Sequence, residues 1–266
     1  MSLPIRIGNF EIGDGKPVVM IAEGCDNHGG SLDRAKEIAH AAMESGADII
    51  KFQLHIPDEE MHREETVRTS RDMFKQFGSL YEFVRDRALT ADQHAELMAY
   101  CRSIGIQYLC TPFSLKAAEL LRDMGAEGFK IGSGETEDLP FIEEAASMGK
   151  PMIISTGMSE WEEIDLTVAA VKERKAPLAL MHCISVYSSH VAGLLNLGTI
   201  RELRARYDVP VGLSDHTAPE GIADAHGRHV TQEETIFAAI GAGACMVEKH
   251  FTLDRALPDA DSKFSL

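Results

Sequence analysis

Short apolar runs alternate with amphipathic helical periods along most of this chain. Each run is rich in β-branched and other apolar residues and is bounded by glycine or polar residues, a pattern typical of buried β-strands. The order of strands and helices then decides the fold class. Eight strands are expected, at residues 18–23, 48–53, 107–111, 128–132, 152–156, 179–183, 209–214 and 245–250.

The segments between these runs carry helix signals. After the first strand, Ser31 suits an N-cap and Gly46 a helix stop, and apolar residues recur on one helical face at Ala35, Ile38, Ala39, Ala42 and Met43. The pattern therefore predicts a repeated strand–helix unit. Later segments open with capping-box spacing, at Thr90 with Gln93, Ser159 with Glu162, and Thr231 with Glu234.

Eight parallel strands with helical crossovers in about 250 residues predict an α/β fold of the (β/α)₈, or TIM-barrel, type. A doubly wound sheet is the alternative, but residues 23–30 lack the GxGxxG pattern of its first turn. Residues 1–17 are expected to form an N-terminal β-hairpin, with its turn at residues 13–15, that caps the lower end of the barrel. Residues 18–266 would form the barrel itself.

Two segments depart from the regular spacing. Residues 54–89 and 218–232 are charged, contain histidines and hold few apolar residues, so they are expected to be long loops over the upper end of the barrel. Few residues follow the eighth predicted strand. We therefore expect the barrel to be C-terminally incomplete, with its eighth helix absent from this chain.

Composition narrows the possible partners. The 266 residues include 42 acidic and 26 basic side chains, and the net charge of -16 has the wrong sign for binding nucleic-acid phosphates or anionic lipid. No apolar run is long enough to span a bilayer and no signal peptide opens the chain, so a cytoplasmic protein is expected. The five cysteines lack CxxC spacing, which argues against disulfides and structural zinc.

Polar residues gather at the predicted upper strand ends, where barrels of this type carry their chemistry. Lys51 and Lys130 lie inside otherwise apolar strands, where a buried ammonium group needs an anionic partner. One hypothesis pairs each lysine with Glu23 or Glu135 in an internal salt bridge. The other makes both lysines part of a cradle for a phosphate and a carboxylate, completed by the hydroxyl groups of Thr111, Ser133, Ser155 and Ser214.

His216 and His250 are candidate metal ligands. They end neighbouring predicted strands, and imidazoles at neighbouring strand ends can converge on one ion. A pair of hydrogen-bonded structural histidines is the alternative. Asp215 and Glu248 are candidates for orienting the imidazoles from behind, and Asp215 is also a possible ligand.

Nine motifs follow one another along essentially the whole chain: Ile21-Ala-Glu23, Asn27-His28, Lys51-Phe-Gln53, Cys110-Thr-Pro-Phe113, Phe129-Lys-Ile-Gly-Ser-Gly-Glu135, Ser155-Thr-Gly-Met158, His182-Cys183, Gly212-Leu-Ser-Asp-His-Thr217 and Glu248-Lys-His-Phe-Thr-Leu-Asp-Arg255. In this order they closely resemble the N-acetylneuraminate (sialic acid) synthase family, and specifically its N-terminal catalytic barrel. Nine motifs in one order are far more specific than any single motif.

The resemblance implies that phosphoenolpyruvate condenses with an acyclic N-acyl amino sugar, which releases phosphate and yields a nine-carbon 2-keto sugar acid. It implies a divalent metal, Mn²⁺ or else Mg²⁺, on His216 and His250, an acid/base role for Glu135, and a homodimer. Phosphoenolpyruvate would be held by Lys51, Lys130, Thr111, Ser133, Ser155, Ser185 and Ser214. The amino sugar would meet Glu23, Gln53, Tyr187 and Asp261.

Some features depart from the family. Residues 187–190 read Tyr-Ser-Ser-His where the family has Tyr-Pro-Thr-Pro, and the segment from residue 216 to 250 is longer than usual. The family's C-terminal antifreeze-like domain, which reaches the partner subunit's site, is expected to be absent. Two other functions stay open: a Schiff-base aldolase that uses Lys51 or Lys130, and a catalytically silent sugar- or phosphate-binding barrel.

Overall fold

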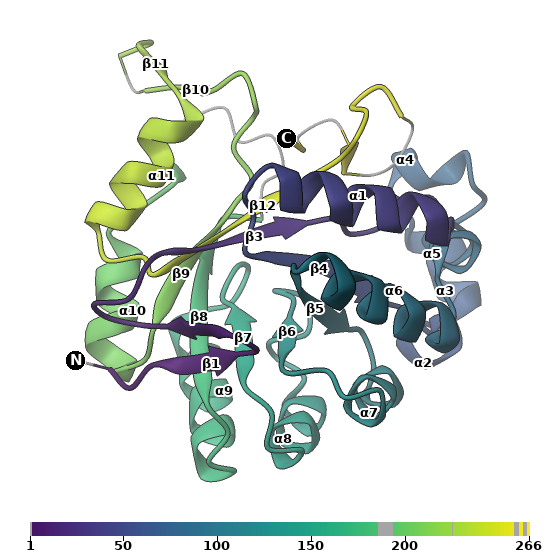
Figure 1. Cartoon of the computed structure of the whole chain (residues 1–266), viewed down its shortest axis with the longest axis horizontal. Helices are drawn as coiled ribbons and strands as arrows, with labels where there is room; N and C mark the ends of the chain where they lie inside the picture. Colours follow the sequence, from purple (N-terminus) through teal and green to yellow (C-terminus); the bar gives the residue numbers. More distant parts are fainter. Residues whose placement is uncertain (1, 186–193, 225, 258–260, 263–264) are drawn as a thin grey trace.

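The computed structural model describes residues 2–185, 194–224, 226–257, 261–262 and 265–266. Eight parallel strands form its central sheet: β3 (Val19–Glu23), β4 (Ile49–Leu54), β5 (Gln107–Pro112), β6 (Phe129–Ile131), β7 (Met152–Ser155), β8 (Leu178–Cys183), β9 (Val211–Asp215) and β12 (Met246–His250). Their spatial order is β5-β4-β3-β12-β9-β8-β7-β6. The end strands β5 and β6 lie side by side, so the sheet closes into the predicted TIM barrel (Figure 1).

Helices cover the outside of the barrel between successive strands (Figure 1): α1 (Leu32–Glu44), α6 (Ala91–Ile104), α7 (Leu115–Asp123), α8 (Leu139–Ser147), α9 (Trp161–Glu173), α10 (Thr199–Tyr207) and α11 (Gln232–Gly241). Their apolar faces pack on outward-facing strand residues in the main core, where Phe52 and Phe129 are fully buried. Within the described residues no α-helix follows β12, and no helix is both long and apolar enough to cross a membrane.

The helix starts agree with the sequence to within one residue. Capping boxes are present at Thr90 and Thr231, as predicted. The capping box predicted at Ser159 lies one residue later, at Glu160, whose N–H donates to the Glu163 carboxylate at 2.6 Å. Glutamate can replace serine there because its carboxylate also interacts favourably with the positive end of the helix dipole.

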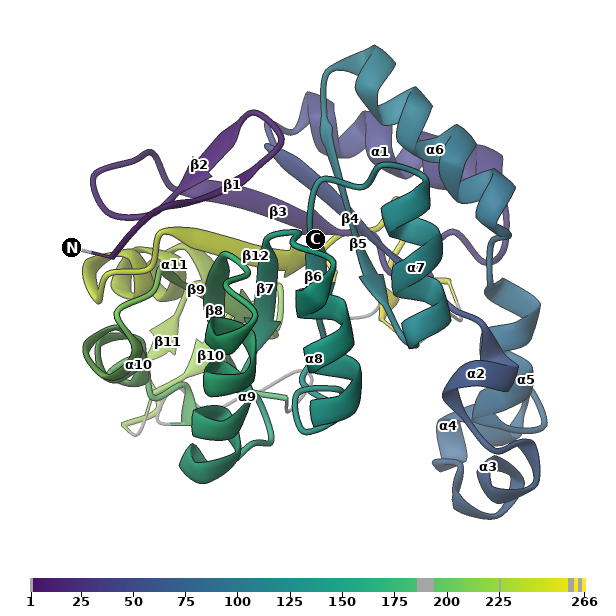
Figure 2. The same cartoon turned by 90° about the horizontal axis from the view of Figure 1, so that it is seen from below.

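The N-terminal segment forms a hairpin of β1 (Ile5–Ile7) and β2 (Phe10–Ile12), seen beside the start of β3 in Figure 2. Its turn is Gly8-Asn9 and not residues 13–15, because Ile7 pairs directly with Phe10 and Gly8 has the positive φ, +55°, that such a tight turn needs. Buried hairpin residues fill the lower end of the barrel: Ile5, Ile7 and Ile12 pack with Val19, Ile21, Ile49, Leu109, Ile153, Ala179, Met181 and Met246.

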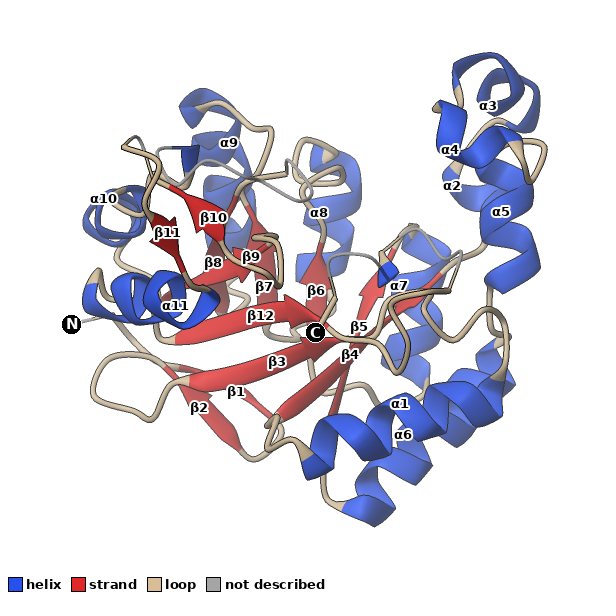
Figure 3. Ribbon diagram, turned by 90° about the horizontal axis from the view of Figure 1, so that it is seen from above, coloured by secondary structure: helices blue, strands red, loops and turns tan. Residues whose placement is uncertain are grey.

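The segment expected as the first long loop is helical instead. It forms α2 (Pro57–Glu60), α3 (Arg63–Thr69), α4 (Asp72–Lys75) and α5 (Leu80–Arg87), which we call the α2–α5 lobe. The lobe stands out at one side of the barrel (Figure 3). Its apolar residues are sparse in sequence but meet in space, since the rings of Phe74 and Phe77 lie 5.1 and 5.0 Å from that of Phe83.

The second expected loop, residues 218–232, contains a small hairpin of β10 (Ile222–Ala223) and β11 (His229–Val230). The Asp224 carboxylate closes its turn by accepting the N–H groups of His226 and Arg228 at 2.8 Å each. The loop prediction is therefore wrong in part.

Beyond β12 the chain folds back over the upper end of the barrel. The Leu266 N–H donates to the His250 carbonyl at 2.8 Å. The buried Asn27 side chain holds the same segment, because its amide N–H donates to Ser265 Oγ at 3.2 Å and its amide oxygen accepts from Ser262 Oγ at 3.3 Å. This return brings Ser262, Ser265 and Leu266 back to the upper ends of the strands.

Interior-facing residues change character over one two-residue step along six of the eight barrel strands. Ile21 and Ile49 belong to the apolar lower end, whereas Glu23 and Lys51, two positions later, line a cavity at the upper end. Both members of each pair face inward because side chains alternate along a strand. The same step separates Leu109 from Thr111, Ile153 from Ser155, Met181 from Cys183, and Met246 from Glu248.

Candidate active site

A cavity of about 350 Å³ opens at the upper end of the barrel interior. Strands from all around the barrel contribute to it. It brings together nearly all the residues that the sequence singles out: Glu23, Lys51, Gln53, Thr111, Lys130, Ser133, Glu135, Ser155, Ser185, Ser214, His216, His250 and Asp261. Tyr187 lies outside the described residues.

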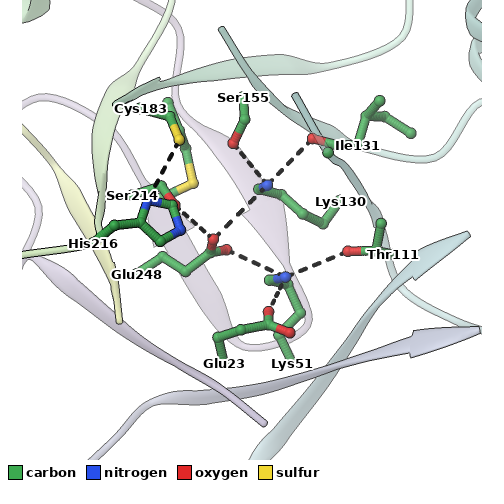
Figure 4. A network of polar contacts seen from close by, with 12 residues as sticks. Glu23, Lys51, Thr111, Lys130, Ile131, Ser155, Cys183, Ser214, His216 and Glu248 are labelled. Carbon is green, nitrogen blue, oxygen red and sulfur yellow. Dashed lines mark hydrogen bonds and ion pairs between the residues drawn. The ribbon is translucent and has the colours of Figure 1, made fainter. Parts of the chain in front are cut away.

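Two buried lysines share one carboxylate in this cavity (Figure 4). Lys51 Nζ forms an ion pair with Glu23 and lies 3.6 Å from Glu248 Oε2, while Lys130 Nζ lies 3.8 Å from Glu248 Oε1. These side chains are at most 5% exposed. The internal salt bridge expected for Lys51 is therefore present, but Lys130 pairs with Glu248 and not with Glu135.

Hydroxyl groups surround the same charges (Figure 4). Lys51 Nζ donates to Thr111 Oγ1 at 3.4 Å, and Lys130 Nζ donates to Ser155 Oγ at 2.8 Å. The Ser214 hydroxyl donates to the shared carboxylate at 2.9 Å. The salt bridges and the ring of hydroxyls thus belong to one network, and the two hypotheses for the lysines are compatible.

Ser133 and Ser185 reach the cavity from the turns after β6 and β8. Gly157, in the turn after β7, leaves room for both hydroxyls. A Cβ atom at residue 157 would lie 2.4 Å from Ser185 Oγ and 2.7 Å from Ser133 Oγ, closer than non-bonded atoms approach. The absence of a side chain here keeps this part of the cavity open.

Burial and neighbouring charges shift several pKa values in the cavity. Burial lowers the pKa of Lys51 to about 8, although the Glu248 carboxylate acts in the opposite direction. Burial alone would raise the pKa of Glu248, but the ammonium groups of Lys130 and Lys51 outweigh it and hold the pKa below its usual value. Glu248 is therefore an anion that keeps two cations inside the barrel.

Glu135 differs from Glu248 in its surroundings. Its Oε2 atom is buried and has no hydrogen-bond partner among the described residues. Burial raises the pKa of Glu135, and the more distant charge of Lys130 only partly opposes this shift. A carboxyl group with a raised pKa at the wall of a cavity suits proton transfer.

The two candidate imidazoles face each other. The ring centroids of His216 and His250 lie 5.2 Å apart. His216 Nδ1 lies 3.7 Å from Cys183 Sγ, and His250 Nδ1 lies 3.8 Å from Asp261 Oδ2. Burial raises the pKa of Asp261 to about 6. The sequence correctly places both imidazoles at one point of the cavity.

Asp215 faces away from the cavity and does not have the orienting role expected for it. Its carboxylate accepts from Lys249 Nζ at 2.8 Å and from the Thr217 hydroxyl at 2.8 Å. Asp215 pairs with Lys249 across β9 and β12, whereas Ser214 pairs with Glu248, so the alternation of side chains points the two pairs to opposite faces. Asp215 therefore belongs to a buried ion pair outside the cavity.

A chain of hydrogen bonds connects the α2–α5 lobe to the cavity. Gln53 Nε2 donates to Glu23 Oε1 at 3.4 Å, and Gln53 Oε1 lies 3.0 Å from His55 Nε2. His55 Nδ1 lies 2.8 Å from Glu60 Oε2 in α2. The lobe thereby fixes the orientation of two residues that the sequence assigns to the sugar.

Residues 38–266 match the NeuB family. The chain belongs to the NeuB family. It is 34% identical over 253 residues to the N,N'-diacetyllegionaminic acid synthase of Legionella pneumophila, which covers 93% of this chain and 67% of that protein. It is also 35% identical over 262 residues to an uncharacterized protein of Methanocaldococcus jannaschii, covering 98% and 70% of the two chains. The predicted resemblance to sialic acid synthases is confirmed.

Solved structures agree with this NeuB assignment. The N-acetylneuraminic acid (sialic acid) synthetase of Leptospira borgpetersenii superposes with a TM-score of 0.81 at 30% identity, over 100% of this chain and 84% of that one. A truncated 3-deoxy-D-arabino-heptulosonate 7-phosphate synthase of Thermotoga maritima gives a TM-score of 0.72 at 16% identity, which shows the barrel fold alone.

Sequence reasoning gave one member of this NeuB site another role and missed two others. Glu248 is expected from the sequence to orient the imidazoles, but it pairs with both lysines from the inward face of β12, two residues before His250. Phe113 follows a strand end and also lines the cavity. Arg71 reaches the cavity from the α2–α5 lobe, whose residues show no clear helical periodicity in the sequence.

Proposed function

We propose that this NeuB-family chain condenses phosphoenolpyruvate with the open-chain form of an N-acyl amino sugar. The products would be a nine-carbon 2-keto sugar acid and inorganic phosphate. The observation that carries the proposal is the pair of buried ammonium groups, Lys51 and Lys130, held at one carboxylate within a ring of hydroxyls. Such a cradle suits a ligand that carries both a phosphate and a carboxylate.

Phosphate binding would exchange one anion for another. Glu248 now accepts from Ser214 and neutralises the two lysines, so donors are already aligned at a point where negative charge is stable. Phosphate oxygens would take over part of these contacts. Prealigned donors cost little reorganisation when the leaving phosphate gains charge.

The chemical step would proceed in a site with little bulk water. The methylene carbon of the enol attacks the aldehyde carbon and forms the C–C bond, and water then adds to the resulting cationic carbon. The C–O bond to phosphate breaks, and phosphate leaves with the bridging oxygen. Glu135, whose pKa burial raises, is suited to give a proton to the alkoxide or to take one from the water.

A divalent cation, Mn²⁺ or Mg²⁺ by family resemblance, fits the imidazole side of the cavity. His216 and His250 face each other and Asp261 approaches His250, which together offer nitrogen and oxygen donors. When bound, such a cation would polarise the aldehyde and stabilise the developing alkoxide. Assembly as a homodimer and a cytoplasmic location also remain predictions for this chain.

The sugar would extend toward the α2–α5 lobe. A second cavity of about 520 Å³ adjoins the first through Gln53, Arg71 and Asp261. Its wall is largely apolar and aromatic, with Phe74, Leu80, Phe83, Val84 and Phe113. An apolar wall beside polar groups suits the methyl and amide parts of an N-acyl substituent.

Phosphate release tests the proposal directly. Phosphoenolpyruvate, a divalent cation and a panel of N-acyl hexosamines should give phosphate only when all three are present. The same hexosamines without the acyl group should react far more slowly. Binding of phosphoenolpyruvate with no release for any sugar would instead support the silent binding barrel.

The aldolase alternative rests on Lys51, because a lowered pKa is what a Schiff-base lysine needs. Borohydride reduction in the presence of pyruvate should leave Lys51 and Lys130 unmodified. A pyruvyl adduct on either lysine would contradict the proposal.

A further inference from the structure

A cysteine, a histidine and an aspartate converge beside the imidazole pair. One ligand atom each from Cys25, His250 and Asp261 lies within 4.8 Å of the other two. They come from the turn after β3, from the end of β12 and from the segment that returns over the barrel. Cys25 is fully buried and the Asp261 side chain is 24% exposed.

Asn27 fixes the geometry of this cluster. It lies two residues after Cys25, and its amide contacts Ser262 and Ser265, which both follow Asp261. The hydroxyl of Ser265 also donates to the Asp261 carbonyl at 2.7 Å. Asp261 is therefore held toward Cys25 by buried hydrogen bonds, although it lies far away in sequence.

Cys25 has a backbone conformation that favours glycine. Its φ is +34°, in the left-handed region, which is strained for a residue with a Cβ. Strain of this kind persists where the surrounding structure holds it, often at functional sites. The turn keeps the thiol at the upper end of the barrel despite this cost.

The surroundings of the cluster favour a cation. Asp261 belongs to the group itself, and Asp26 follows Cys25 directly in the same turn. Two carboxylates beside the thiol would stabilise a divalent cation, and the thiol would lose its proton on binding it.

We propose that Cys25, His250 and Asp261 together bind one divalent cation, and that the thiolate shifts the preference of this site from Mn²⁺ toward Zn²⁺, Co²⁺ or Fe²⁺. Sulfur ligands select these softer metals, whereas Mn²⁺ prefers oxygen donors. Three protein ligands leave a coordination position for a substrate oxygen, as in catalytic zinc sites. The assignment rests on the proposed function only for the role of the metal, not for its binding.

The proposal changes the roles expected from the sequence. Asp261 becomes a metal ligand and not a sugar contact. His216 lies outside the three-residue group among the described residues, and its Nδ1 faces Cys183. His250 is a metal ligand both in the family resemblance and in this proposal.

Cobalt binding tests this site without any turnover. The full chain is stripped with a chelator, kept reduced, and titrated with Co²⁺ while the near-ultraviolet thiolate-to-cobalt charge-transfer band is recorded. The native chain should bind one Co²⁺ with this band. Cys25→Ser should lose the band and weaken Co²⁺ binding by about tenfold or more. Asp261→Asn should keep the band but bind more weakly.

Cys183→Ser is the matched control, because Cys183 is also buried and lies beside His216. It should retain the band. Co²⁺ binding to the native chain without a thiolate band, or loss of the band in Cys183→Ser with retention in Cys25→Ser, would overturn the assignment. Thermal melting of each apo variant shows whether the fold is intact.

The outcomes separate this proposal from the proposed function. A thiolate band without phosphate release from phosphoenolpyruvate and any N-acyl sugar would keep the metal site and remove the synthase activity. Phosphate release with Mn²⁺ in a chain that shows no band would keep the activity and remove Cys25 from the metal site.

Discussion

The lower and upper ends of the barrel interior are built from the same strands but serve opposite purposes. At the lower end, Ile7 of the hairpin packs among strand residues such as Ile49 in a closed apolar cluster. Two residues further along the same strand, Lys51 lies in a network of charges and hydroxyls. The first end gains stability from removing apolar surface from water, whereas the second must offset the cost of burying charge.

This difference predicts how each end responds to mutation. Filling or emptying the lower end should change the free energy of unfolding and leave the chemistry of folded molecules intact. Changes at the upper end should alter binding and turnover more than stability, because functional sites often hold groups that stabilise the fold poorly.

Replacing Lys130 should reduce activity more than any other change considered at the upper end. Lys130→Met keeps the length of the stem but removes the ammonium group that contacts Ser155 and Glu248. The value of kcat/KM for phosphoenolpyruvate should fall by about 10²–10³-fold, measured by phosphate release. The exposed Lys116→Met serves as control, and an equal loss in both variants would contradict a specific role for Lys130.

Shortening a buried side chain of the hairpin should destabilise the lower end of the barrel. Ile7 is fully buried, and Ile7→Ala should lower the free energy of unfolding by about 2–5 kcal/mol, measured by denaturant titration. The exposed Leu3→Ala should change it by less than about 0.5 kcal/mol. A large loss of phosphoenolpyruvate affinity in folded Ile7→Ala would show that the two ends are not independent.

A methyl group at residue 157 should affect the upper end of the barrel through steric contact alone. In Gly157→Ala the new Cβ must push aside the hydroxyls of Ser185 and Ser133, so kcat/KM for phosphoenolpyruvate should fall by about 10–10²-fold. Gly241→Ala is the control, because a Cβ there meets no atom within 4 Å. Unchanged kinetics in Gly157→Ala would remove these hydroxyls from the site.

The pH dependence gives a smaller effect. Burial lowers the pKa of Lys51 to about 8, so its ammonium group is lost as the pH rises through 8. Affinity for phosphoenolpyruvate should therefore decline above pH 8, by at most about tenfold per pH unit. The free energy of unfolding should instead rise as the pH increases above about 8, because burying the neutral amine of Lys51 costs less than burying its ammonium ion. Lys51→Arg should reduce this loss of affinity above pH 8. Titration calorimetry with phosphoenolpyruvate at several pH values measures the affinity of both proteins.

The strand order and most of the cavity were predictable because both follow from local patterns. Apolar runs defined the strands, and the alternation of side chains placed Glu23, Lys51 and Thr111 on the inward face. The same rule separates Ser214 from Asp215 and Glu248 from Lys249, but pairing Asp215 with Lys249 needed the register between two strands that are distant in sequence.

Other features depend on contacts that sequence spacing does not reveal. Residues 13–15 have a stronger turn composition than Gly8-Asn9, yet pairing of Ile7 with Phe10 decides the hairpin. The α2–α5 lobe is held by aromatic contacts across short helices with weak periodicity. Asp261 reaches the site because Asn27 and the His250 carbonyl bind the returning segment.

A crystal structure with phosphoenolpyruvate bound would test the central claim most directly. The phosphate should contact the ammonium groups of both Lys51 and Lys130, with hydroxyls of Ser155 and Ser214 completing its shell. Phosphoenolpyruvate bound elsewhere, with both lysines still paired only to Glu248 and Glu23, would contradict the account.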